Sequence, residues 1–399
     1  MSKCTEIIEE YKKYLMPTYA PSIVISKAKG SRVYDADGKQ YYDFTSGIGC
    51  HNVGHCTEGV VKAIQDQAAM LTHCSNLFVN EPQVKLAKKL VEISGLGGKV
   101  FFCNSGAEAN EAAIKLARKW GSANGGRYEV ITMRNGFHGR TLATITATGQ
   151  DWCQAGFEPL PVGFAYADFN DLESVKAALT DKTVAIMLEA VQGEGGVTPA
   201  TPEFMAGVRA LCDEKNLLMI CDEVQCGMGR TGMWWGWQNF GVKPDLFTCA
   251  KSIADGVPMG ALVSNAKFAD VFQAGNHAST FGGNALACAA ALATIKIIED
   301  EKLLAAAKTK GEMLKAALQA FAEKYDQVLD VRGLGLLLGM VVDGDPKAVV
   351  EAFRDMGVLA LTAGGNVVRF LPTLSMTEAH IEEAVEMMGD ALDGLWSEE

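Results

Sequence analysis

The sequence predicts an α/β protein with a large domain built on a mainly parallel sheet and a smaller α+β domain. Short apolar runs alternate with helical patterns through most of the chain, and this alternation favours a parallel sheet with helices on both faces. The pattern of predicted elements changes towards the C-terminus, where long helices lead into strands interleaved with shorter helices. A chain of 399 residues is long enough for two or more domains.

The N-terminal part of the chain predicts an amphipathic helix followed by a small antiparallel sheet. The helix covers residues 1–15, and residues 23–44 alternate around the turn sequence DADG, which is typical of a hairpin. Two further helices are predicted at residues 58–71 and 81–94 from their apolar spacing.

Short apolar runs predict the strands of the large sheet. In chain order they read KVFFCNS, YEVITM, VAIMLEA, LLMICDE, LFTCA and GALVS, and their length and apolar character indicate buried strands. The first run leads directly into a helical pattern at residues 106–120. Ligands of such sheets bind at the carboxyl ends of the strands, so polar residues that follow these runs are the first candidates for a site.

The C-terminal part predicts two long helices within residues 284–324 and a second group of strands. These strands read VLDVRGLGLLLGMVV, VLALTA and NVVRFLP, and a last helix is predicted at residues 377–395. We expect residues 1–55 to contribute to the small domain, residues 56–283 to form the large ligand-binding domain, and residues 284–399 to form the rest of the small domain.

The bulk properties disfavour several classes of partner. The formal net charge is -12, so no basic surplus exists for binding nucleic acid or an anionic membrane. No apolar run reaches the roughly 18 residues of a membrane span, and the N-terminus lacks the features of a secretory signal. The 11 cysteines are scattered without a CxxC pair, which indicates reduced thiols and a cytoplasmic protein.

One cluster of possible metal ligands needs a separate interpretation. Cys50, His51, His55 and Cys56 lie in the stretch CHNVGHC. This spacing matches none of the usual zinc patterns, and adjacent ligands fit one tetrahedral ion poorly. We expect a turn before a helix here, and no metal.

Three features at the predicted strand ends carry chemistry. Asp222 closes an apolar strand, where an unpaired charge would cost several kcal/mol, so it needs a cationic or donating partner. Residues 105–107 open a helix and could bind phosphate through free backbone amides, although Ser105 with Glu108 also fits an ordinary capping box. Lys251 follows another apolar strand. If it is buried, its pKa would be lowered and its amine would be a nucleophile. The plainer alternative is a lysine whose side chain extends to the surface.

Together these features fit one cofactor, pyridoxal 5'-phosphate. Lys251 would bind its aldehyde covalently, Asp222 would pair with its protonated pyridine nitrogen, and the helix start would hold its phosphate. A nicotinamide cofactor is disfavoured, because no GxGxxG motif lies at a strand–helix turn with an acidic residue downstream.

Seven stretches resemble, in order and spacing, the signature segments of class III pyridoxal-phosphate aminotransferases. They read FFCNSGAEANEAAIKLAR, NGFHGRTLATITATG, LEAVQGEGGVTPA, DEVQCGMGRTG, CAKSIADGVPMGA, STFGGNALACAAA and VVRFLPTLSMTEAHI. The resemblance covers nearly the whole chain and is strongest to the acetylornithine aminotransferases of arginine biosynthesis. It implies the aspartate-aminotransferase fold (pyridoxal-phosphate fold type I), with a mainly parallel seven-stranded sheet in the large domain, and a homodimer with shared active sites. The implied reaction moves the terminal amine of N-acetylornithine to 2-oxoglutarate, giving N-acetylglutamate 5-semialdehyde and glutamate.

The resemblance also assigns roles in cofactor binding. Lys251 and Asp222 would be catalytic. Phe137 and Val224 would pack on opposite faces of the cofactor ring, although plain core packing is the alternative for both. Thr280 would reach the phosphate from the partner subunit. The full cofactor-binding set is Ser105, Gly106, Ala107, Phe137, His138, Asp222, Val224, Gln225, Lys251 and Thr280.

A second implied set binds the substrate. Arg140 resembles the arginine that takes the side-chain carboxylate of glutamate or the carboxylate of N-acetylornithine, and Arg369 the one that takes the α-carboxylate of glutamate. Glu194 resembles the glutamate that pairs with Arg369 when no such carboxylate is bound. Tyr19 and Ser279 would also contact substrate. A surface ion pair is the alternative for the charged residues, and it is less favoured for Arg369, which lies in an apolar run.

The chain departs from the family pattern at three places. Ala254 and Asp255 stand where many relatives have glycines, Ala190 stands where proline is common, and GHCTEG lacks the usual His-Pro. These changes affect loop shape and substrate choice rather than cofactor chemistry. Alternative donors are therefore ornithine, 4-aminobutyrate, succinylornithine and succinyl-diaminopimelate. An aminomutase, a decarboxylase or a non-catalytic protein is disfavoured by the intact lysine, aspartate and arginine–glutamate pair.

Overall fold

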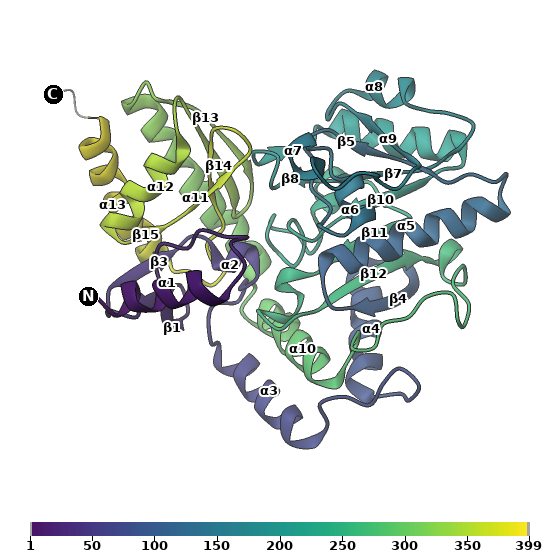
Figure 1. Cartoon of the computed structure of the whole chain (residues 1–399), viewed down its shortest axis with the longest axis horizontal. Helices are drawn as coiled ribbons and strands as arrows, with labels where there is room; N and C mark the ends of the chain where they lie inside the picture. The colour runs from purple at the N-terminus through teal and green to yellow at the C-terminus, as the bar shows by residue number, and fades with distance from the viewer. Residues whose placement is uncertain (1, 397–399) are drawn as a thin grey trace.

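The computed structural model describes residues 2–396, and a seven-stranded sheet forms the centre of its larger lobe (Figure 1). Strand β12 is antiparallel to both of its neighbours, and all other pairs are parallel. The predicted mainly parallel sheet is thus confirmed, and β6 is its one strand that the apolar runs did not indicate. In spatial order the strands are β4 (Gly97–Cys103), β12 (Gly260–Asn265), β11 (Leu246–Cys249), β10 (Leu218–Asp222), β7 (Thr183–Glu189), β5 (Glu129–Met133) and β6 (Phe164–Ala167).

Helices cover both faces of this sheet, because successive strand residues point to opposite sides. Helix α5 (Gly106–Ala123) packs on the face that carries Leu218 of β10. Helix α9 (Pro202–Lys215) packs on the opposite face, which carries Met219. The other helices of this region are α3 (Glu58–Met70), α4 (Glu81–Ser94), α6 (Leu142–Ala147), α7 (Asp151–Gln154), α8 (Leu172–Ala177), α10 (Ala285–Asp300), and the 3-10 helices η1 (Gly236–Phe240), η2 (Lys251–Ala254) and η3 (Ala266–Phe268).

Two four-stranded sheets form the second lobe (Figure 1). The first runs β1 (Ile25–Lys29), β2 (Arg32–Asp35), β3 (Gln40–Asp43), β15 (Val358–Leu359), and the second β13 (Val328–Leu334), β14 (Leu337–Val342), β17 (Val367–Phe370), β16 (Leu361–Ala363). The run VLALTA thus supplies β15 and β16 to two different sheets. Because β15 pairs in parallel with β3, the N-terminal strands join the C-terminal part of the chain.

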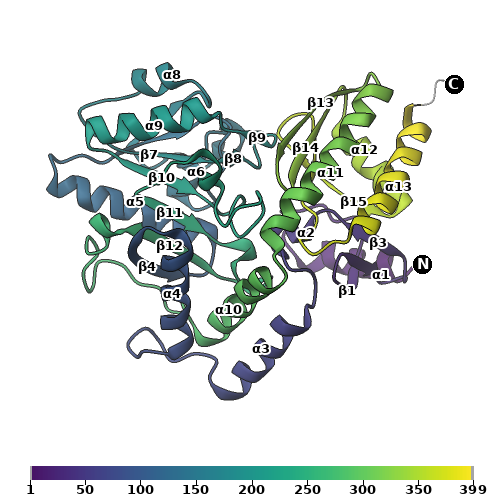
Figure 2. The same cartoon turned by 180° about the vertical axis from the view of Figure 1, so that it is seen from behind.

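Helices of both chain ends belong to this second lobe. Helices α1 and α13 lie in it in both views (Figure 2), while α10 packs against α3 and α4 on the other side of the molecule. No helix within residues 2–396 is long and apolar enough to cross a membrane. The remaining elements are α1 (Lys3–Tyr14), α2 (Ser46–Gly49), α11 (Leu303–Lys324), α12 (Pro346–Met356), α13 (Glu378–Trp396), and the short ribbon of β8 (Val191–Gln192) and β9 (Thr198–Pro199).

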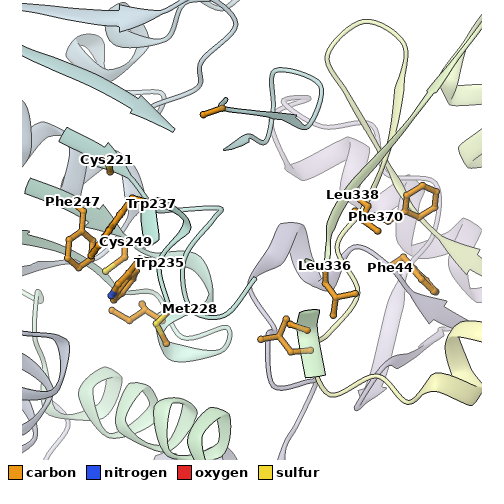
Figure 3. Packing of buried hydrophobic residues seen from close by; sticks show 14 of the residues in the cluster. Phe44, Cys221, Met228, Trp235, Trp237, Phe247, Cys249, Leu336, Leu338 and Phe370 are labelled. Carbon is orange, nitrogen blue, oxygen red and sulfur yellow. The ribbon is translucent and has the colours of Figure 1, made fainter. Parts of the chain in front are cut away.

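Buried aromatic side chains fix the strand ends on either side of the molecule's centre (Figure 3). Trp235 packs on Phe247 of β11, with ring centroids 4.4 Å apart. In the second lobe, Phe44 meets Phe370 of β17 edge-on at 6.2 Å. Since neighbouring strand residues point to opposite sides, burial of Phe370 turns the preceding Arg369 away from this core.

Candidate active site

A cavity of about 440 Å³ opens at the carboxyl ends of β4, β10 and β11. Most of the residues that the sequence singles out line it, although they come from distant parts of the chain. The lining includes Ser105, Gly106, Ala107, Phe137, His138, Arg140, Glu194, Asp222, Val224, Gln225 and Lys251. The topology of the sheet therefore gathers these side chains around one space.

Asp222 is held at this edge by a buried hydrogen-bond network. The amide of Asn110 donates to its Oδ2 at 2.8 Å, His138 Nδ1 lies 2.8 Å from the same oxygen, and the backbone amide of Val224 donates to Oδ1 at 3.0 Å. Thr248 donates to the Asn110 carbonyl oxygen at 2.6 Å and so orients that amide. Burial opposes the charging of His138, but its contact with Asp222 holds its pKa above the usual value.

The sequence patterns did not predict Asn110 and Thr248 as residues of the site. The one available signal was a polar residue on a buried helical stripe, since Asn110 lies beside the buried Ala109 and Ala113 of α5. The network leaves the Asp222 carboxylate on the cavity wall. A cationic ring nitrogen inside the cavity could reach it, which fits pyridoxal phosphate.

The start of α5 forms a cradle suited to phosphate. Ser105 accepts a hydrogen bond from the Glu108 amide at 3.2 Å, and the Glu108 carboxylate accepts one from the Asn104 amide at 2.7 Å. The helix start is therefore capped in the ordinary way, yet the first helical amides, those of Gly106 and Ala107, have no acceptor within the helix. A Cβ at Gly106 would lie 2.9 Å from Val224 Cγ1, so glycine keeps this approach open.

Lys251 lies at the other side of the cavity, where β11 ends and η2 begins. Its backbone φ is +49°, a left-handed conformation that is uncommon outside glycine. Burial lowers the pKa of its amine, while the nearby Glu194 carboxylate acts in the opposite direction. A larger fraction of neutral amine follows, and the neutral amine is the nucleophile that the cofactor's aldehyde requires.

Arg369 lies behind the cavity wall and is only 2% exposed. Its Nη1 lies 2.7 Å from Glu194 Oε1 and donates to Gln225 Oε1 at 2.9 Å and to the Gly193 carbonyl at 3.0 Å. Burial opposes ionisation of Glu194, but Arg369 and Lys251 hold its pKa below the usual value. The expected arginine–glutamate pair is thus present at the cavity edge.

Glu189 is a further cavity residue, for which the sequence gave only its place at a strand end. Its carboxyl oxygens accept hydrogen bonds from the backbone amides of Phe137 at 3.0 Å and Gly193 at 3.1 Å. It therefore ties the loop that carries Phe137 to the loop that carries Glu194. Burial and the charge of Asp222 raise its pKa to about 7.

Besides Arg369, three predicted residues do not line the cavity of their own chain: Tyr19, Ser279 and Thr280. Tyr19 is 75% exposed and Thr280 is also exposed. Ser279 instead accepts a hydrogen bond from Asn104 Nδ2 at 3.3 Å and from the Gly282 amide at 3.0 Å.

The stretch CHNVGHC forms a tight structure before α3. His55 Nε2 lies 2.7 Å from Asp43 Oδ2, and the rings of His51 and His55 have centroids 4.2 Å apart. Within residues 2–396, no group of three or more histidine, cysteine or acidic side chains is arranged to hold a metal ion.

Comparisons with known proteins agree on one family. The profile of the family "Aminotransferase class-III" matches residues 15–392. An acetylornithine aminotransferase of Methanocaldococcus jannaschii is 48% identical over 98% of both chains, and one of Caldanaerobacter subterraneus is 47% identical over 96% of this chain and 98% of its own. Among solved structures, an ornithine aminotransferase from Toxoplasma gondii superimposes with a TM-score of 0.96 at 33% identity, covering 100% of this chain and 97% of that one. An N-acetylornithine aminotransferase from Stenotrophomonas maltophilia gives 0.85 at 34% identity, covering 98% and 99%.

Proposed function

Because the chain belongs to the class-III aminotransferases, we propose that it transfers the terminal amine of N-acetylornithine to 2-oxoglutarate, with pyridoxal phosphate as cofactor. The products are N-acetylglutamate 5-semialdehyde and glutamate, as in arginine biosynthesis. The observation that carries the choice of substrates is the buried Arg369–Glu194 pair at the cavity edge, together with relatives of that name at 42–48% identity.

The residues of the cavity wall divide the work of holding the cofactor. The amides of Gly106 and Ala107 would bind the phosphate, Phe137 and Val224 would enclose the ring, and Asp222 would pair with its nitrogen. Ser105 caps the helix start, His138 contacts Asp222, and Gln225 would hydrogen-bond near the phenolic oxygen. When bound, pyridoxal phosphate supplies a ring that accepts the electron pair left on the substrate carbon.

Lys251 would hold the cofactor covalently and move the proton. Its neutral amine, favoured by burial, is the nucleophile that would bind the aldehyde of the cofactor. The free amine of Lys251, which lines the cavity, would then act as the base and acid that moves a proton during the reaction.

Arg140, Arg369 and Glu194 distinguish the two substrates. N-acetylornithine reacts through its terminal amine, so its distant carboxylate binds Arg140 and Arg369 keeps Glu194 as its partner. Glutamate reacts through its α-amine, so its α-carboxylate binds Arg369 after Glu194 moves aside, and its side-chain carboxylate binds Arg140. Bidentate arginine–carboxylate pairing gives each mode a defined orientation.

We further propose a homodimer in which each site is completed by the partner. Thr280 and Ser279 lie away from the cavity of their own chain, and Thr280 of the partner subunit would reach the phosphate, while Tyr19 would complete the substrate site. An exposed apolar stretch supports this assignment, since Leu77 is 87% and Val79 82% exposed, and such stretches mark interaction surfaces.

The division into residues 1–55, 56–283 and 284–399 is proposed as the domain organisation. Pairing of β3 with β15 supports placing the N-terminal segment with the small domain, whereas α10, at the start of the last segment, packs against α3 and α4 of the larger lobe. A cytoplasmic location is proposed as well, because all 11 cysteines are free and seven of them are buried.

A donor panel tests the proposed function. Steady-state rates with 2-oxoglutarate should be highest for N-acetylornithine, ahead of ornithine, 4-aminobutyrate, succinylornithine and succinyl-diaminopimelate. Ornithine is the second candidate donor, because the fold superimposes so well on an ornithine aminotransferase. A clear preference for any donor other than N-acetylornithine would overturn the choice of substrate but leave the aminotransferase assignment intact.

A further inference from the structure

The guanidinium of Arg140 contacts two aromatic rings. Its central carbon is 5.3 Å from the centroid of the Phe137 ring and 5.1 Å from that of the Trp152 ring. Among the described residues no carboxylate lies within ion-pair distance of Arg140. The two rings are therefore its main structural neighbours, and its hydrogen-bonding capacity is not taken up by an internal acid.

This arrangement prepares the arginine for a carboxylate. A guanidinium stacks on aromatic rings through its two faces and donates hydrogen bonds through its edges. Contacts with rings rather than with an acid leave its N–H groups available for a bidentate carboxylate. The rings also restrict a long side chain before the ligand arrives, so less conformational freedom is lost on binding.

Trp152 stands outside the cofactor cavity, at the entrance. Phe137 and Arg140 line both the inner cavity and a neighbouring space of about 1000 Å³, whereas Trp152 lines only the outer space. Its side chain is 69% exposed, so burial in a core does not explain its position. Its indole donates to Gln150 Oε1 at 3.1 Å, which helps to hold the ring in place.

We propose that Trp152 is a positioning residue for the distal carboxylate of the substrate and that it acts through Arg140. The inference rests on the proposed function, in which Arg140 receives that carboxylate. Trp152 keeps the guanidinium against Phe137 in the free enzyme. It also covers the outer side of the arginine–carboxylate pair, where reduced access of water strengthens the attraction. Its loss should weaken substrate binding and leave the chemical steps unchanged.

Two substitutions at Trp152 distinguish the contribution of its aromatic ring from that of its size. Trp152→Leu removes the π-face, and Trp152→Phe keeps one. Phe157→Leu is a matched control, because Phe157 is also exposed (57%) and nearby in the chain but lines neither space. In single-turnover reactions with N-acetylornithine, Trp152→Leu should raise the half-saturating concentration about two- to fivefold, the range expected of an exposed cation–π contact. The limiting rate should not change, and Trp152→Phe and Phe157→Leu should behave like the wild type.

A double-mutant cycle with Arg140→Ala tests whether Trp152 acts through the arginine. The effect of Trp152→Leu on kcat/KM should disappear in the Arg140→Ala background, because coupled residues are not additive. An equal effect in both backgrounds, or a lower limiting rate with unchanged half-saturation, would overturn the proposal. If the wild type does not react with N-acetylornithine, the proposed function fails separately. The double-mutant cycle can then be measured with glutamate as the donor, because its side-chain carboxylate would bind the same arginine.

Discussion

Removal of Glu194 should shift the preference of the enzyme towards glutamate. Glu194 Oε1 lies 2.7 Å from Arg369 Nη1 and accepts a hydrogen bond from Gln225 Nε2 at 3.1 Å. In the proposed function, this pair stays intact with N-acetylornithine as donor, whereas the α-carboxylate of glutamate has to displace Glu194 from Arg369. Glu194→Ala removes the competitor in one half-reaction and leaves Arg369 without an anion in the other.

The size of the shift follows from the burial of the pair. Arg369 is 2% exposed, so water cannot fully replace the hydrogen bond and the negative charge that Glu194 offers to it. The pKa of Glu194 is held below its usual value against the effect of burial, with Arg369 the main cause, so the pair is charged at neutral pH. A charge-assisted hydrogen bond contributes about 1.5–3 kcal/mol, and about 1.4 kcal/mol is a factor of ten. The ratio of kcat/KM for glutamate to that for N-acetylornithine should rise about tenfold or more.

Stopped-flow absorbance of the cofactor measures each half-reaction with one donor at a time. Glu194→Gln is the matched control, because it keeps an oxygen that can accept from Arg369 but removes the charge. Its ratio should fall between those of the wild type and Glu194→Ala. If Glu194→Ala slows both half-reactions equally, Glu194 is a structural residue and the switch does not exist.

Three further substitutions test the cofactor site. Lys251→Ala should abolish the absorption band of the lysine-bound cofactor; a colourless wild-type protein that takes up no added pyridoxal phosphate would contradict the cofactor assignment. Asp222→Ala should retain some cofactor, but its transamination rate should fall at least about tenfold. The reason is that a charge-assisted hydrogen bond of about 1.5–3 kcal/mol and the protonation of the ring nitrogen are lost together. Near-normal turnover would mean that Asp222 serves another partner. Gly106→Ala should weaken cofactor binding about tenfold in a fluorescence titration, because the new Cβ lies 2.9 Å from Val224 Cγ1 and overpacking typically costs about 1–3 kcal/mol. Adding Val224→Ala should restore part of that affinity. If it does not, the contact with Val224 is not the cause of the loss.

The main groups of the site could be predicted because each follows a local pattern. Asp222 and Lys251 come directly after short apolar runs, and Ser105 begins a helix after another. A mainly parallel sheet then brings the carboxyl ends of these strands to one edge. The local pattern and the topology therefore suffice to place these residues in one cavity.

The supporting residues could not be predicted, because their positions depend on contacts between distant segments. Thr248 is a buried polar residue in an apolar strand, and its role appears only when Asn110 of another element lies 2.6 Å away. Trp152 lies in the four-residue helix α7, which has no distinctive sequence pattern, and its contact with Arg140 depends on how α7 packs against distant segments. For the same reason, the run VLALTA does not reveal that β15 and β16 join different sheets, since β15 pairs with β3 from the other end of the chain.

The acidic side chains at the ends of β7 and β10 influence one another's ionisation. Asp222 pairs in register with Glu189, and Glu223 is the next residue along the chain. Three buried carboxylates this close would repel one another. Burial and the charge of Asp222 raise the pKa of Glu189 to about 7, and burial raises the pKa of Glu223 to about 8. A proton on either of these two acids lessens the repulsion among the three groups. Ionisation of one carboxyl group is therefore coupled to that of the others.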